Sequence, residues 1–236
     1  RDRSPSRGLG DVYKRQVMQG DTLRDPKILQ GGNIAKFDCV IANPPFSLEN
    51  WGATEWSSDK YKRNIYGTPS DSCGDYAWIQ HMICSMSSGK GRMAVVMPQG
   101  ILFRGNQEAE IRKQLVESDL IEAVVTLGDK LFYGTGLSPC FLIIRRMKQA
   151  HHSGRILMID GSKILTQKRA QNILEENDID RLYSLYQNYS DEEDYSRIVT
   201  LQEIRDKEYN LSPNRYVVYH KEEIRPYAEV LAEFKQ

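Results

Sequence analysis

The sequence predicts an α/β protein with a doubly wound, mostly parallel β-sheet and a helical extension at its C-terminal end. Two observations support this fold class. Short apolar segments of strand length alternate with segments whose apolar residues follow helical spacing, which is the pattern of strand–helix–strand units. In addition, 40% of the 236 residues are hydrophobic and 27% are charged, which is typical of a globular chain of one or two domains.

The first predicted strand spans 36–42 and is apolar enough to be buried. Asn43, Pro44 and Pro45 end it, because proline cannot donate to a sheet ladder. A long polar loop follows over 47–72, and long ordered loops are often functional. Helical spacing then predicts a helix over 75–88, with Asp75 as its N-cap.

The remaining elements follow from the same two patterns. Strands are predicted at 92–97, 120–127, 138–145 and 155–159, and helices at 106–117, 171–189 and 226–234. Because the last strands follow one another without a helix, we expect that edge of the sheet to be antiparallel. We place the C-terminal part of an α/β domain at 17–165 and a mainly helical extension, suited to subunit contacts, at 166–236.

Residues 1–16 carry five positive and two negative side chains and show neither strand nor helix periodicity. We interpret this segment as a translated linker artefact, with a disordered basic arm as the alternative.

Charge and cysteine usage limit the classes of function. Lysine plus arginine and aspartate plus glutamate both number 32, so binding to nucleic acid by bulk charge alone is excluded. No unbroken apolar run exceeds five residues, as in 140–144, so no membrane association is expected. The four cysteines are far apart and form no CxxC pair, which predicts free thiols in the cytoplasm and no metal site.

The sharpest chemical feature is Asn43-Pro44-Pro45-Phe46 at the end of the first strand. The carboxyl ends of strands are where open α/β sheets bind ligands. The Pro44–Pro45 peptide has no N–H, so the carbonyl oxygens of Asn43 and Pro44 and the Asn43 side-chain oxygen can accept from an exocyclic amino group. Phe46 offers a face on which a base can stack. An amino group held in this way can attack a sulfonium methyl group. The alternative is a rigid turn with no chemical role.

The segment 38–47, DCVIANPPFS, resembles the catalytic motif of adenine-N6 DNA methyltransferases. Further segments resemble one branch of that family, the modification subunits of type I restriction–modification systems. They are GDTL at 20–23, DYAWIQH at 75–81, MPQGILFR at 97–104, LFYGTG at 131–136 and EYNLSPNRY at 208–216. The matches occur in order and cover about 17–219. The resemblance implies a Rossmann-like fold that uses S-adenosylmethionine.

The resemblance also implies roles for individual residues. The four residues 43–46 hold an adenine flipped out of duplex DNA, because its amino group is otherwise paired. Asp21 accepts a hydrogen bond from the adenine amino group of the cofactor, with an N-cap or loop carboxylate as the alternative. The glycine-rich cofactor loop and the ribose-binding acidic residue of the family have no counterpart here. We therefore expect an N-terminally truncated catalytic domain that binds the cofactor poorly and is inactive by itself.

Other residues are weaker candidates for the same site. Aromatic and basic side chains in the long loop suit contact with DNA near the extruded base, with a loop folded on its own domain as the alternative; they are Trp51, Trp56, Lys60, Lys62 and Arg63. Phe132 and Tyr133 line either the base pocket or a buried hairpin. His81 is expected to be a packed histidine and not a catalytic base.

The resemblance implies duplex DNA, a DNA-specificity subunit and a second modification subunit as partners, with a restriction subunit as a further one. Two alternatives stay open. One is an Asn-Pro-Pro methyltransferase that acts on protein glutamine or RNA. The other is a non-catalytic subunit or remnant retained for assembly.

Overall fold

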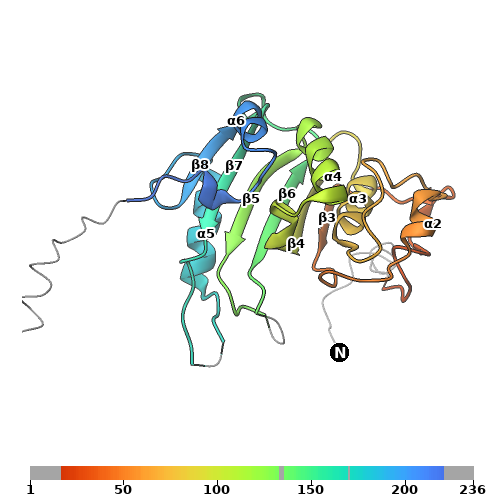
Figure 1. The fold of residues 1–236 in the computed structure, drawn as a ribbon, viewed down its shortest axis with the longest axis horizontal. Helices are drawn as coiled ribbons and strands as arrows, with labels where there is room; N and C mark the ends of the chain where they lie inside the picture. The colour runs from red at the N-terminus through yellow and green to blue at the C-terminus, as the bar shows by residue number, and fades with distance from the viewer. Residues whose placement is uncertain (1–16, 133–135, 170, 221–236) are drawn as a thin grey trace, which may run out of the picture.

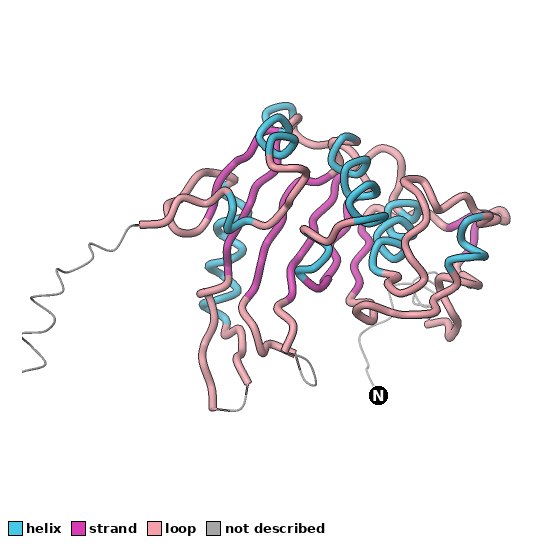
Figure 2. The backbone as a smooth tube through the Cα atoms, in the orientation of Figure 1, coloured by secondary structure: helices cyan, strands magenta, loops and turns pink. Residues whose placement is uncertain are grey.

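The structure is a computed structural model that describes residues 17–132, 136–169 and 171–220. Its centre is a six-stranded sheet with strand order β3-β4-β6-β5-β7-β8 (Figures 1 and 2). The strands are β3 (Cys39–Ala42), β4 (Arg92–Pro98), β5 (Ile121–Leu127), β6 (Pro139–Arg145), β7 (Arg155–Gly161) and β8 (Ser196–Thr200). A separate two-stranded ribbon joins β1 (Leu29–Gln30) and β2 (Asn33–Ile34).

Helices cover both faces of the sheet, which confirms the predicted α/β class. The α-helices are α2 (Ala53–Ser57), α3 (Asp75–Ser85), α4 (Asn106–Glu117), α5 (Glu176–Asn188) and α6 (Leu201–Asp206). The described residues also form three 3-10 turns: η1 (Gln99–Leu102), η2 (Ala150–His152) and η3 (Pro213–Arg215). α3, α4 and α6 pack with one face of the sheet in the larger core cluster, and α5 packs on the other face over β5 and β7.

The sheet is mixed, and one of its inner strands, β6, runs opposite to both neighbours. The sequence predicted antiparallel pairing only at the edge of the sheet. β3 pairs parallel with β4, and β5 pairs parallel with β7. β6 runs antiparallel to both β4 and β5, so it lies inside the sheet. The edge beyond β7 is antiparallel, as predicted, but the strand that forms it is β8. The side chains of β6 are mostly apolar on both faces of the sheet, so the strand can be packed against hydrophobic clusters on both sides. The carboxyl ends of β3, β4, β5 and β7 therefore share one edge, the lower edge in Figure 1.

β3 is an edge strand, and the expectation of a buried strand is wrong for half of its residues. Among the described residues it pairs only with β4. Val40 and Ala42 pack against the larger core cluster, whereas Ile41 is 77% exposed. The cause is alternation, since successive side chains of a strand point to opposite faces and α3 covers only one of them.

Helix boundaries differ from the predictions for local reasons. Gly74 and not Asp75 is the N-cap of α3. α3 ends at Ser85 because the next residues pair with Phe37, whose N–H donates to the Ser85 carbonyl and whose carbonyl accepts from Ser87. α5 begins at Glu176, where a capping box between Glu175 and Asp178 sets its start.

The segment after residue 165 is not only a helical extension. It contributes β8, which pairs antiparallel with β7 and extends the sheet. α6 follows β8 directly, and Thr200 caps it by accepting from the Glu203 N–H at 3.2 Å. The predicted helix at 226–234 and the segment 1–16 lie outside the described residues.

None of the helices in the described ranges is both long enough and apolar enough to cross a membrane.

Candidate active site

The Asn43–Phe46 turn leaves the carboxyl end of β3 at the shared edge of the sheet. Pro44 is buried and anchors the turn, whereas Asn43 and Pro45 are exposed and Phe46 is half-buried. Among the described residues, the Asn43 side-chain amide has no hydrogen-bond partner. The turn therefore presents an exposed amide and a half-buried aromatic ring, with Pro44 packed in the interior.

Phe46 meets Phe132, so the structure brings together two of the residues that the sequence singled out. Their ring centroids lie 6.0 Å apart with an interplanar angle of 76°, an edge-to-face contact. Phe132 comes from the loop after β5, which is tied in turn to the loop after β7. Asn172 donates its N–H to the Lys130 carbonyl at 3.0 Å, and the Gln171 side chain donates to the Leu131 carbonyl at 2.9 Å. Tyr133 lies outside the described residues.

Asp75 connects this turn to the interior, a role that its prediction as an N-cap missed. The Ser47 N–H, one residue after Phe46, donates to Asp75 Oδ1 at 2.8 Å. Arg104 donates to Asp75 Oδ2, and the Cys73 thiol donates to the same oxygen at 3.3 Å. The Asp75 side chain is fully buried, with 0% of its surface exposed. The signal in the sequence was a carboxylate at a helix start, which does not reveal partners 28 residues earlier and 29 residues later.

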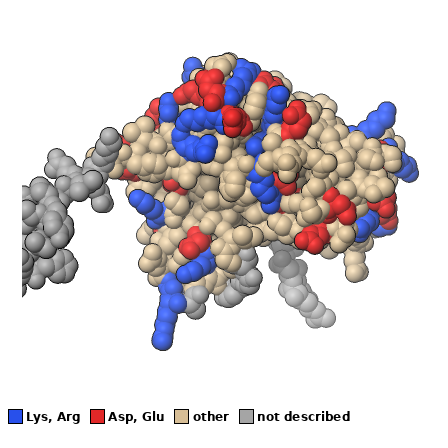
Figure 3. Space-filling model, viewed as in Figure 1, with Lys and Arg blue, Asp and Glu red and all other residues tan. Residues whose placement is uncertain are grey.

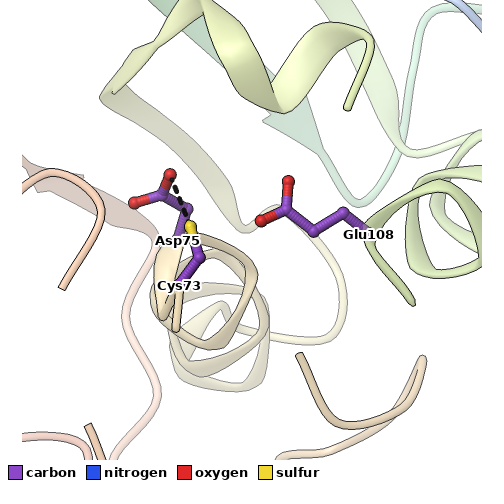
Figure 4. A group of neighbouring side chains, drawn as sticks. All are labelled: Cys73, Asp75 and Glu108. Carbon is purple, nitrogen blue, oxygen red and sulfur yellow. Dashed lines mark hydrogen bonds between the residues drawn. The ribbon is translucent and has the colours of Figure 1, made fainter. Parts of the chain in front are cut away.

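Cys73, Asp75 and Glu108 form a compact group whose donor atoms lie within 4.8 Å of one another (Figure 4). Such a group can suit a metal ion, but here Arg104 already supplies the cation, since its Nε also donates to Glu108 Oε2 at 2.7 Å. Burial raises the pKa of the Cys73 thiol to about 12, so the sulfur keeps its proton and acts as a donor. These observations fit a hydrogen-bonded ion network, and we assign no metal to it.

Three of the five residues proposed for DNA contact in the long loop are buried and hold the loop together. Trp51 and Trp56 are each 2% exposed and pack edge to face, with ring centroids 5.6 Å apart. Arg63 is 1% exposed and lies over the Trp56 ring at 4.5 Å. For these three residues the structure supports the alternative, a loop folded on its own domain. Lys60 and Lys62 are exposed.

Arg63 is the buried centre of that loop. Its guanidinium pairs with Asp59 at 2.7 Å and donates to the carbonyl oxygens of Thr22 and Leu23 at 2.9 and 2.6 Å. It also contacts His81 Nδ1 on α3 at 3.2 Å. Burial, with the Arg63 charge as a second cause, lowers the pKa of His81 to about 4. His81 is therefore a neutral, packed histidine, as the sequence predicted.

Asp21 forms a small turn beside this centre. Its Oδ1 accepts the N–H groups of Leu23 and Arg24, each at 3.0 Å, and its Oδ2 pairs with Arg24 at 3.3 Å. This is the geometry of the alternative reading, a loop carboxylate that caps a turn. Because Arg63 holds the carbonyls of the next two residues, the turn is nevertheless fixed in position.

Comparison with known proteins gives one consistent result. The family model described as N-6 DNA Methylase matches residues 10–224. The MjaVII methylase subunit, a type I restriction enzyme subunit from Methanocaldococcus jannaschii, is 36% identical over 237 residues, which covers 96% of this chain and 40% of the relative. The HindI methylase subunit from Haemophilus influenzae is 31% identical over 190 residues, covering 77% of this chain and 42% of the relative.

Solved structures agree with these relatives. The methyltransferase subunit of a type I restriction-modification system from Streptococcus thermophilus superposes with a TM-score of 0.80 at 28% identity, covering 89% of this chain and 43% of that one. The EcoKI M protein, at 19% identity and a TM-score of 0.60, shares the fold over 92% of this chain and 50% of its own. The chain thus spans about two-fifths of the length of the curated relatives it matches.

Proposed function

The chain belongs to the N-6 DNA methylase family, and from this premise we propose that it forms part of the modification subunit of a type I restriction–modification system. The intact subunit transfers a methyl group from S-adenosylmethionine to N6 of an adenine in duplex DNA. The observation that carries the proposal is the exposed Asn43 amide beside the Phe46–Phe132 ring pair, at the sheet edge where α/β proteins bind ligands.

The turn suits the chemistry of an aromatic amino group. The Asn43 side-chain oxygen and the Pro44 carbonyl accept its two hydrogens, which draws the nitrogen toward a tetrahedral form with an available lone pair. Phe46 stacks against the base, with Phe132 behind it at 6.0 Å. Pro45 removes a competing backbone donor from the turn. S-adenosylmethionine supplies the methyl group from its sulfonium centre. After transfer the nitrogen loses a proton readily, so the site needs no strong base.

The residues present fit only a small part of a cofactor site. Asp21 is exposed, but both of its carboxylate oxygens already have partners within its own turn. We propose that residues of the intact subunit outside these 236 supply the rest of the cofactor site, and that they pack alongside β3. The exposure of Ile41 and the open side of this edge strand support that arrangement.

The 236-residue chain alone is accordingly expected to bind S-adenosylmethionine weakly and to lack activity. Titration of the purified chain in a calorimeter measures this. Heat that saturates at micromolar cofactor would overturn the proposal that the glycine-rich loop is needed and is supplied from elsewhere.

The proposed partners are duplex DNA, a DNA-specificity subunit, a second modification subunit and a restriction subunit, in the cytoplasm. Charged side chains of both signs are interspersed on the face shown in Figure 3, and the formal net charge is zero. This balance supports a chain that leaves sequence recognition to a partner and contacts DNA locally. Lys60, Lys62, Phe132 and Tyr133 remain the proposed local contacts.

The experiment that tests the proposal follows the transferred methyl group. The product of the native gene is assembled with its specificity subunit and incubated with radiolabelled S-adenosylmethionine and, in parallel, with DNA, RNA or protein. We expect label in DNA only. Label in protein glutamine or RNA would select the other Asn-Pro-Pro methyltransferases, and the absence of label in all three would favour an assembly subunit.

A further inference from the structure

Ser47 carries the backbone from the Asn43–Phe46 turn into the long loop in an unusual conformation. Its φ of 51° lies in the left-handed region, which non-glycine residues rarely adopt without being held there. The hold comes from Asp75, whose Oδ1 accepts the Ser47 N–H at 2.8 Å. A partly buried, charge-assisted bond therefore fixes the backbone one residue beyond Phe46.

The Asp75 carboxylate is itself held from a second direction. Arg104, between η1 and α4, donates to Asp75 Oδ2, and the Arg104 carbonyl accepts from Arg112 at 2.8 Å. Glu108 pairs with the other side of the Arg104 guanidinium at 2.7 Å. Figure 4 shows Asp75 at the start of α3 and Glu108 reaching toward it from α4. The carboxylate thus joins the start of one helix, the start of another and the turn at the end of β3.

We infer that Asp75 is a positioning residue for methyl transfer, which sets the placement of Asn43 and Phe46 by holding the Ser47 N–H. The catalytic half of this inference rests on the proposed function. Asp75 does not face the adenine, because it is fully buried and both of its oxygens have partners in the protein. It acts only through the backbone of the turn.

A carboxylate at a helix start also stabilises the helix through its dipole, and that role alone would concern stability only. The distinguishing feature is the long-range bond to Ser47, 28 residues away in the chain. A purely structural carboxylate and a positioning carboxylate therefore differ in two measurable properties: the protection of the Ser47 amide, and the rate of the chemical step in the folded enzyme.

The test compares Asp75→Ala, Asp75→Asn and the control Glu108→Gln in the native gene product with its specificity subunit. Glu108→Gln alters the same arginine network but not the bond to Ser47. The readouts are hydrogen exchange of the Ser47 amide, resolved to single residues by mass spectrometry, and kcat and KM for DNA and S-adenosylmethionine. For Asp75→Ala we expect Ser47 exchange about 10-fold faster or more, and kcat lower by about 100-fold with the cofactor KM within about threefold.

Asp75→Asn keeps an acceptor oxygen, so we expect it to fall between the wild type and Asp75→Ala in both readouts, while Glu108→Gln matches the wild type. Folded Asp75→Ala with unchanged Ser47 exchange, or with unchanged kcat, would overturn the inference. If Asp75→Ala does not fold, the same two readouts on Asp75→Asn decide. A wild type that does not methylate DNA refutes the proposed function and, with it, the role of Asp75 in methyl transfer. In that case hydrogen exchange of the Ser47 amide still shows whether Asp75 holds the turn.

Discussion

The long loop over 47–72 and the turn over 43–46 are neighbours in the chain but differ in how they place their polar side chains. The loop encloses the ion pair at its centre, since Arg63 is 1% exposed and bonded to Asp59 and to two backbone carbonyls. The turn leaves its Asn43 amide exposed, with no partner among the described residues. The contrast shows that the buried ion pair of the loop serves the fold, and it supports our proposal that the exposed amide of the turn serves a ligand. Substitutions in the two regions should therefore separate stability from activity.

The largest effect is expected at Arg63. Arg63→Met leaves the Asp59 carboxylate, 6% exposed, without its cationic partner, and removes the donors to Thr22 and Leu23. Breaking a buried pair in this way costs about 3–5 kcal/mol of unfolding free energy. Urea unfolding measures the loss. Lys62→Met in the same loop is the control and should lie within about 0.5 kcal/mol of the wild type, because Lys62 is exposed. Equal effects of the two substitutions would contradict the comparison.

Asn43→Ala should behave in the opposite way. Its unfolding free energy should stay within about 0.5 kcal/mol of the wild type, because the amide is exposed. Its rate of methyl transfer should fall by about 100-fold or more, since one acceptor of the reacting amino group is lost. Unfolding and transfer are measured on the same preparation. A stability loss as large as that of Arg63→Met would show that the turn serves the fold.

The third expected effect is a dependence of stability on pH. The pKa of His81 in the folded protein is about 4, below the usual value of 6.5, so the unfolded chain binds a proton first on acidification. The stability that neutral His81 contributes is full above about pH 6.5 and is lost as the pH falls toward 4. Between pH 7 and pH 5 the loss should be about 1–2 kcal/mol. Urea unfolding at both pH values should show a smaller difference in His81→Gln, and an identical difference would exclude His81 as its source.

The smallest effect is expected for the Phe46–Phe132 pair. Edge-to-face rings contribute about 0.5–1.5 kcal/mol beyond the area they bury. A double-mutant cycle with Phe46→Leu and Phe132→Leu should give a coupling energy of this size in unfolding. Zero coupling would mean that the loop after β5 does not support the turn.

Much of the fold could be predicted because its signals are local. α4 was predicted at 106–117 and spans Asn106–Glu117, and β4, β5, β6 and β7 fall within a residue or two of their predicted ranges. Five ordered segments besides the catalytic motif carried the family resemblance, and the match to the family model and to the type I methylase subunits confirms it. The sequence did not show that β3 is an edge strand. An apolar run indicates that a strand is buried, but it does not show which strands lie beside it. β6 was misplaced because its two pairing partners are a tertiary property.

The candidate site could be proposed in part from the sequence, because some of its residues are adjacent in the chain. Asn43–Phe46 stands out as four consecutive residues, and Phe132 was named beside it. Arg63 was proposed for DNA because basic and aromatic residues in a loop resemble a binding surface, but its partners at 22, 23 and 81 are far away in sequence. Asp75 was missed as a site residue because Ser47 and Arg104 are equally remote. Buried ion networks cannot be inferred from spacing along the chain.

The most direct test identifies the methylated nucleoside that the native gene product forms in DNA. DNA incubated with the protein, its specificity subunit and S-adenosylmethionine is digested to nucleosides and analysed by mass spectrometry, for the wild type and for Asn43→Ala. The account predicts N6-methyladenosine in its deoxy form from the wild type and a loss of about 100-fold or more in the variant. Methylation at cytosine, or an undiminished yield from a folded Asn43→Ala, would contradict the assignment of the exposed turn as the site that holds the adenine.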